Sequence, residues 1–195
     1  LSQNPWLDPA YMLALGNQTD LTHGDMLGYF AALPGIETLG IYIEGFKDLD
    51  GLAFAKAVRK AVLNGKQIVV YKSGRTAPGQ GGVMGHTASI AGGLTLFESV
   101  VRHAGAIVAE DFNSFDDLFY IAGVLQGKKI GGLRIGAISG AGFEAVGMAD
   151  NIESDSFALE MGALEDATVK KVEEILVAKK LDQLVEVRNP IDINP

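Results

Sequence analysis

The sequence predicts an α/β protein built on parallel β-sheets. Between Tyr11 and Tyr71, three apolar runs alternate with two segments that have the hydrophobic periodicity of helices. A strand–helix–strand–helix–strand order requires crossover connections, which produce parallel strands with helices packed on the sheet faces. The chain has 195 residues, of which 48% are hydrophobic and 21% are charged. This composition supplies enough apolar material for the core of such a fold.

The elements of the first half follow from local patterns. Strands are expected at Tyr11–Leu15, Thr38–Ile43 and Gln67–Tyr71. The first helix follows Asp20 or Thr22, either of which can cap it, and ends at Pro34-Gly35. The second helix, Leu52–Leu63, carries apolar side chains at helical spacing.

The same α/β pattern restarts after residue 92. The expected elements are a helix at Thr95–Ala104, a strand at Gly105–Ala109, a helix from Ser114 to Leu125, a buried strand at Leu133–Ile138 and an amphipathic helix at Glu165–Lys180. We therefore expect two flavodoxin-like units with doubly wound parallel sheets, at residues 1–92 and 93–195.

A glycine-rich segment, KSGRTAPGQGGVMGHTASIAGG, directly follows the third expected strand. Glycine permits a close approach of the backbone to an anionic group, and neutral imidazole is a good nucleophile, so His86 is a candidate for phosphoryl chemistry. In parallel sheets, ligands gather at the carboxyl ends of the strands, where Asn17, Glu44 and this segment are all expected. The local pattern alone slightly favours an inert, solvent-exposed His86.

A second glycine-rich turn, Ser139–Phe143, lies between an expected strand and a helix. Such a turn can hold an anion at the helix N-terminus. Close packing of the helix against the strand explains the glycines equally well.

Composition excludes several classes of function. The formal net charge of −8 argues against nucleic acid as the main partner, because phosphate contacts require clusters of Lys and Arg. The sequence has no cysteine, which excludes disulfides, thiolate catalysis and zinc–cysteine sites. It contains no apolar stretch of the length of a membrane span and begins without the pattern of a signal peptide, so we expect a cytoplasmic protein that does not bind membranes.

Several segments together resemble the NDP-forming acyl-CoA synthetase superfamily, which includes succinyl-CoA synthetase (its α subunit) and the ADP-forming acetyl-CoA synthetases. The segment TAPGQGGVMGHTASIAGG resembles the phosphohistidine loop of that family, and the most specific part of the resemblance is the ordered set Leu15–Asn17, Glu44–Gly45, Lys72–Arg75 and Gly85–Thr87. The similar segments also include YMLALGNQTDLTHGDMLGYF, IETLGIYIEGFKD, GKQIVVYKSGRT, HAGAIVAEDFNSFDDLF and NPIDINP. The resemblance covers most of the chain.

The resemblance implies roles for five residues. His86 matches the phosphorylated histidine, and Glu44 matches the α-side glutamate that orients it. Asn17, Gly85 and Thr87 would position the loop or the phosphate, and no residue is expected to hold a metal. In the implied cycle, acyl-CoA and phosphate give an acyl phosphate, its phosphoryl group passes to His86, and the phosphohistidine phosphorylates ADP.

The resemblance also implies partners, because the chain lacks a CoA-binding Rossmann motif and an ATP-grasp domain. CoA and ATP or ADP with Mg²⁺ would be substrates bound largely by those other domains or subunits, and the isolated 195 residues would be inactive. The family resemblance admits a homodimer. Ala88 replaces the usual glycine, a small-for-small change that should be tolerated. The acyl group and the choice between ADP and GDP are not encoded in these residues.

An alternative is a non-catalytic, ligand-sensing module, because synthetase-like regions also occur in protein acetyltransferases. A sensing module has no chemical need for the pair of His86 and Glu44, so their presence favours an enzyme. A simple nucleotide- or flavin-binding protein is disfavoured, because no aromatic-flanked phosphate loop follows the first expected strand.

Overall fold

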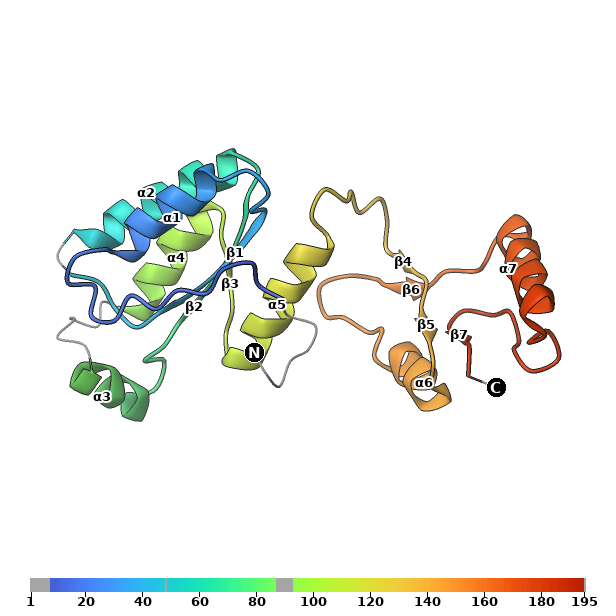
Figure 1. The fold of residues 1–195 in the computed structure, drawn as a ribbon. Helices are drawn as coiled ribbons and strands as arrows, with labels where there is room; N and C mark the ends of the chain where they lie inside the picture. Colours follow the sequence, from blue (N-terminus) through green and yellow to red (C-terminus); the bar gives the residue numbers. More distant parts are fainter. Residues whose placement is uncertain (1–7, 48, 87–92, 195) are drawn as a thin grey trace. The chain divides into compact units, whose positions relative to one another are not determined.

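The computed structural model describes residues 8–47, 49–86 and 93–194. The chain forms two compact units, Leu1–Lys129 and Ile130–Pro195 (Figure 1). The expected boundary at residues 92 and 93 falls inside the first unit, because the strand at residues 107 and 108 pairs with the sheet formed by the preceding strands. Within the described residues, the longest apolar helices fall short of what a membrane crossing requires.

The first unit is a three-stranded parallel sheet with helices on both faces. Its elements in chain order are α1 (His23–Ala32), β1 (Thr38–Ile43), α2 (Asp50–Leu63), β2 (Gln67–Lys72), α3 (Ala77–His86), α4 (Leu94–Ala104), β3 (Ile107–Val108) and α5 (Phe112–Val124). The strand order is β1-β2-β3, and β1 runs in register with β2 from the pair Thr38–Gln67 to the pair Ile43–Lys72. The predicted α/β class with parallel sheets is confirmed.

Alternation along β1 and β2 explains how both faces of this sheet are covered (Figure 1). The side chains of Leu39, Ile41, Ile43, Ile68 and Val70 join the main core, which is completed by α1, α2 and α4. On the other face, α5 lies against the sheet, and a Cβ on Gly40 would come within 3.1 Å of the Phe119 ring. Glycine at this position therefore lets the aromatic side chains of α5 approach the strand closely.

Gly105, directly after α4, lies close to Val62 of α2 and has a backbone conformation that favours glycine. It ends α4 in the left-handed region, with φ of 103°, and a Cβ there would lie 2.8 Å from Cγ1 of Val62. We expect Gly105→Ala to lower the free energy of unfolding by about 2 kcal/mol, because the backbone strain and the clash act together. Gly28→Ala is the matched control: a Cβ at Gly28, inside α1, meets nothing within 4 Å, so we expect it to stabilise slightly. Equal denaturant midpoints for the two variants would contradict this account.

One expected strand of the first unit is absent, and one helix starts well before its expected position. Residues 11–15, expected to form a strand, are irregular; Tyr11 packs its ring 5.2 Å from that of Phe30, and Met12 is 78% exposed. Tyr11 thus contacts α1, and the run does not extend the sheet. Helix α5 begins earlier than expected, because its N-cap is Asp111. The Asp111 carboxylate accepts a hydrogen bond from the Ser114 N–H, and the Ser114 hydroxyl accepts one from the Asp111 N–H, which together form a capping box.

The second unit has two short parallel sheets instead of one. Its elements are β4 (Arg134–Ile135), β5 (Ile138–Ser139), α6 (Gly142–Asp150), β6 (Glu160–Met161), α7 (Asp166–Lys179) and β7 (Ile191–Asp192). Strand β4 pairs with β6 and β5 pairs with β7. The prediction of one buried strand at Leu133–Ile138 is wrong. The segment forms two short strands, β4 and β5, which pair with different partners. Ile138 is 64% exposed.

Candidate functional site

The carboxyl ends of β1 and β2 bring together several polar side chains of the first unit. Glu44 and Gly45 directly follow β1, and Lys72 is the last residue of the neighbouring β2. Because the two strands are parallel and in register, both ends lie at the same edge of the sheet. Ligands bind at this edge in open α/β sheets. The sequence analysis expected Glu44 at this edge.

Gln18 enters this edge from the turn that precedes α1. Its side chain is buried, and its Nε2 donates to the carbonyl oxygen of Gly45 at 3.0 Å. The backbone of Gln18 has φ of 54°, an uncommon conformation for a residue other than glycine. Sequence reasoning selected its neighbour Asn17 instead, and the structure leaves Asn17 exposed in the turn.

His23, the first residue of α1, holds the other end of the Gln18 side chain. Its ring Nδ1 lies 2.7 Å from the amide oxygen of Gln18, and because that oxygen only accepts, Nδ1 carries the proton. Burial lowers the pKa of His23, and a hydrogen bond to the backbone of Tyr42 partly opposes this shift. Burial is the larger of the two effects, so the neutral form of His23 is favoured relative to a solvent-exposed histidine.

This lowered pKa predicts how the unit responds to acid. Below about pH 6.5 the unfolded chain binds a proton at His23 more readily than the folded chain. The free energy of unfolding should hence fall as the pH decreases from about 6.5 toward the folded-state pKa, while above about 6.5 this contribution is fully present. Urea unfolding at a series of pH values should show a smaller slope in this range for His23→Gln than for the parent sequence. An identical slope would contradict the prediction.

Lys72 and Arg75 are both engaged in internal contacts. The Lys72 side chain is only 3% exposed, and its Nζ donates to the carbonyl oxygens of Glu44 at 3.1 Å and Ser73 at 3.3 Å. Burial and the charge of Arg75 lower the pKa of Lys72. Arg75 forms an ion pair with Glu98 of α4 at 2.7 Å. Lys72 is therefore a buried cation instead of a charge on the surface.

The five residues selected from the sequence lie in different parts of the first unit. Glu44 is partly buried and accepts a long hydrogen bond, 3.4 Å, from the hydroxyl of Tyr42. Gly85 and His86 are the last two residues of α3, and Thr87 lies outside the described residues. The structure describes the backbone of His86 only, so the pairing of Glu44 with His86 stays a prediction.

The segment that carries His86 differs from expectation in one respect. It was expected to be a loop preceding a helix, yet Ala77–His86 is itself a helix, which begins after the turn that leaves β2. The Thr76 hydroxyl accepts a hydrogen bond from the backbone N–H of Gly79 at 3.2 Å, which satisfies a donor in the first turn. His86 is thus at the C-terminal end of a glycine-rich helix.

The second glycine-rich turn, Ser139–Phe143, is lined by carboxylates. The Ser139 hydroxyl donates to Glu144 at 2.5 Å, and a Cβ on Gly142 would come within 2.9 Å of the Asp192 carboxylate. Negative charge at the start of α6 disfavours a bound anion. Of the two interpretations of this turn, close packing is the one that the contacts support.

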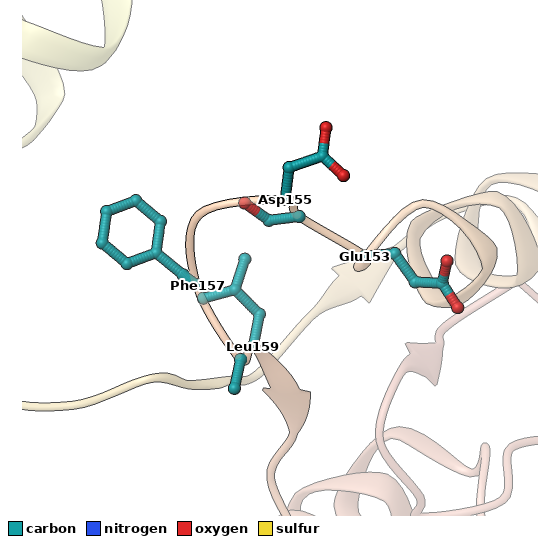
Figure 2. Close-up of a pocket in the computed structure, with 6 residues that line it drawn as sticks. Glu153, Asp155, Phe157 and Leu159 are labelled. Atoms are coloured by element: carbon teal, nitrogen blue, oxygen red, sulfur yellow. The ribbon is translucent and has the colours of Figure 1, made fainter.

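An open hollow of about 410 Å³ in the second unit offers no comparable chemistry. Its lining comes from one loop, residues 153–159, and Figure 2 shows the carboxylates of Glu153 and Asp155 pointing in different directions around it. Phe157 and Leu159 supply its apolar part. Within residues 8–47, 49–86 and 93–194, no group of three or more His, Asp or Glu side chains is arranged to hold a metal ion.

Comparison with known proteins defines the class of this α/β unit. Residues 2–125 match the family described as the succinyl-CoA ligase like flavodoxin domain. The match covers most of the first unit and more than half of the chain. The chain belongs to this family, which confirms the resemblance to the NDP-forming acyl-CoA synthetases.

The similar proteins include ADP-forming acetate–CoA ligases. The chain is 32% identical over 196 residues to the acetate–CoA ligase [ADP-forming] II of Archaeoglobus fulgidus. It is 31% identical over 182 residues to the acetate–CoA ligase [ADP-forming] of Methanocaldococcus jannaschii. These matches cover 100% and 93% of the chain. They cover only 27% and 24% of the two ligases, so the chain spans about a quarter of their length.

A solved structure shows the same relationship. The chain resembles the dinucleotide forming acetyl-coenzyme A synthetase 1 of Candidatus Korarchaeum cryptofilum in complex with phosphate and ADP, with a TM-score of 0.64 and 26% sequence identity. The likeness covers 93% of this chain and 37% of that one.

Proposed function

We propose that this chain is the phosphohistidine-bearing part of an NDP-forming acyl-CoA synthetase. The observation that carries the proposal is the arrangement at the carboxyl edge of the β1–β2 sheet. Glu44 follows β1 there, and the segment that leads to His86 leaves the adjacent end of β2. The family membership of residues 2–125 supports the assignment of His86 as nucleophile and Glu44 as the residue that orients it.

The proposed chemistry begins on the acyl-CoA. A phosphate oxygen attacks the thioester carbonyl carbon, the carbon–sulfur bond breaks, and CoA leaves as an acyl phosphate forms. A ring nitrogen of His86 then attacks the phosphorus, which releases the carboxylate of the acid. An oxygen of ADP attacks the phosphohistidine, the phosphorus–nitrogen bond breaks, and ATP forms with neutral imidazole restored.

The carboxylate of Glu44 has a defined task in this cycle. A hydrogen bond from one ring nitrogen of His86 to Glu44 fixes the tautomer, so that the other nitrogen presents its lone pair to phosphorus. Asn17, Gly85 and Thr87 would position the loop or the transferred phosphoryl group. Loop and helix N–H groups stabilise charge on that group in the transition state.

The remaining parts of the reaction belong to segments beyond these 195 residues. CoA, the nucleotide and Mg²⁺ would be bound by CoA-binding and ATP-grasp domains or subunits, which agrees with the share of the relatives that this chain spans. We place the whole synthetase in the cytoplasm, with an acyl-CoA, an acyl phosphate and a nucleotide as its ligands.

Turnover of the whole proposed synthetase, of which these 195 residues would be one part and which we call the longer parent protein, tests this proposal. We expect it to form ATP from acetyl-CoA or another short acyl-CoA, inorganic phosphate and MgADP, and we expect the isolated 195 residues to form none. Absence of ATP formation across a panel of acyl-CoAs, by a parent protein that is folded and binds nucleotide, would contradict the synthetase and favour a ligand-sensing module.

A further inference from the structure

Two consecutive peptide carbonyls at the end of β1 are each held by a buried side chain from another segment. Gln18 Nε2 donates to the carbonyl oxygen of Gly45 at 3.0 Å, and Lys72 Nζ donates to that of Glu44 at 3.1 Å. In the part of the chain whose burial is described, Gln18, Lys72 and Ser139 are the buried polar or charged side chains. Two of these three thus converge on the Glu44–Gly45 segment.

The orientation of the Gln18 amide is fixed by its other contacts. A carboxamide has one donor end and one acceptor end, and His23 occupies the acceptor end through its ring Nδ1 at 2.7 Å and its backbone N–H at 3.4 Å. The NH₂ group must then face Gly45. Lys47, two residues beyond Gly45, donates from Nζ to the backbone carbonyl of Gln18 at 2.6 Å. The Gln18 turn and the segment after β1 are therefore joined by hydrogen bonds in both directions.

Lys72 holds the same segment from the side of β2. Its ammonium group contacts the carbonyls of Glu44 and Ser73, while the Ser73 N–H donates to the carbonyl of Ile43 at 2.9 Å. Burying an ammonium group is costly unless it is hydrogen-bonded, so the position of Lys72 is coupled to the position of the Glu44 carbonyl. The backbone on which the Glu44 side chain is mounted is therefore restrained from both sides.

We propose that Gln18 and Lys72 are positioning residues, which hold the Glu44–Gly45 backbone so that the Glu44 carboxylate is aimed at the reacting histidine. The proposal rests on the proposed function for the role of Glu44. It adds two residues that contact neither the histidine nor the phosphoryl group in the proposed cycle and that act through Glu44.

Coupling between variants of the longer parent protein tests this role. We expect Gln18→Leu and Lys72→Met each to slow phosphorylation of the histidine by about 10-fold, because a small displacement of a positioned group is costly. In a Glu44→Gln background, the same substitutions should slow it by less than about 2-fold, because the group they position has lost its charge. The proposal would be overturned if Gln18→Leu or Lys72→Met slowed phosphorylation by the same factor in the Glu44→Gln background as in the parent protein.

The opposite end of the sheet provides matched controls. Lys66 Nζ donates to the carbonyls of Leu33 and Ile36 at 3.2 and 2.5 Å, and Gln126 Nε2 donates to Glu37 at 3.1 Å. Lys66→Met removes bonds from a lysine to backbone carbonyls, as Lys72→Met does, and Gln126→Leu removes a glutamine bond to a carboxylate, both at the end of the sheet opposite the proposed chemistry. We expect both to leave the phosphorylation rate within about 2-fold of the parent. A 10-fold loss in either control would show that the effect of Gln18 or Lys72 is only structural.

Hydrogen exchange separates this proposal from the proposed function. In the parent protein, Gln18→Leu and Lys72→Met should raise amide exchange in peptides covering residues 44–47, with no rise in peptides from α5. Unchanged exchange at residues 44–47 would overturn the positioning role, whether or not the parent protein forms phosphohistidine. If Lys72→Met does not fold, Lys72→Gln takes its place. Its shorter side chain keeps a donor but holds it farther from the Glu44 carbonyl, so we expect a change in the same direction and of smaller size.

Discussion

Replacing His86 with asparagine in the longer parent protein is expected to abolish ATP formation from acyl-CoA, phosphate and ADP. Asparagine retains hydrogen-bonding groups, but it cannot accept a phosphoryl group on a ring nitrogen, so the cycle stops at the acyl phosphate. We expect the rate of ATP formation to fall by at least about 10³-fold, as is usual when a covalent nucleophile is removed. A coupled luciferase assay of ATP production measures this change.

His103 provides the control for this substitution. It is exposed in the last turn of α4, and the proposed chemistry assigns it no role. His103→Asn should therefore retain the parent rate within about 2-fold. Equal rates for the parent and His86→Asn would exclude His86 as the carrier of the phosphoryl group.

The second large effect is expected from Glu44→Gln. The substitution preserves the shape of the side chain and removes the charge that favours one tautomer of the histidine. Loss of the orienting carboxylate in catalytic histidine–carboxylate pairs of other enzymes costs about 10⁴-fold, so we expect a decrease of about 10²-fold to 10⁴-fold in the rate of histidine phosphorylation. Rapid quenching of a single turnover measures that rate directly.

Glu37→Gln is the matched control for the glutamate. Glu37 directly precedes the amino end of β1, whereas Glu44 follows its carboxyl end, and Glu37 accepts a hydrogen bond from Gln126. Its substitution should leave the single-turnover rate unchanged within about 2-fold. A Glu44→Gln rate within the same limits would contradict the role assigned to Glu44.

The central strands and their helices are predictable because their patterns are strong. The strand Thr38–Ile43 agrees residue for residue, and β2 extends the expected Gln67–Tyr71 by one residue. Strand β2 is buried at Ile68–Val70, where its apolar run is continuous. In β1, Ile43 is buried and the other residues are partly buried or exposed. The helix at Leu52–Leu63 was also expected, and it begins two residues earlier in the structure.

Elements that depend on distant partners were not predictable in the same way. The residues Tyr11–Leu15 have the composition of a strand, but composition does not say whether a strand has a partner. They form no strand, and Tyr11 contacts Phe30 of α1. The glycines before His86 predict a loop because glycine weakens helices, yet this segment forms α3. Local propensity did not decide the structure here.

The candidate site was predictable where a family motif marked it and not elsewhere. Glu44 and the segment containing His86 were found from their resemblance to the family. The burial of Gln18 and Lys72 was not predicted, because it depends on carbonyl partners 27 and 28 residues away in the sequence. A glutamine after a Gly-Asn turn and a lysine at the end of a strand are typical surface residues, and nothing local in the sequence signals their internal contacts.

The covalent intermediate is the most direct test of the account. The longer parent protein and its His86→Asn variant are incubated with γ-labelled ATP and Mg²⁺, denatured, and tested for label on the protein at acid and alkaline pH. The account predicts label on the parent that is lost in acid and stable in base, recovered on the peptide that contains His86, and no label on the variant. Label that persists on His86→Asn, or a nucleotide-bound parent that takes up none, would contradict phosphoryl transfer through this histidine.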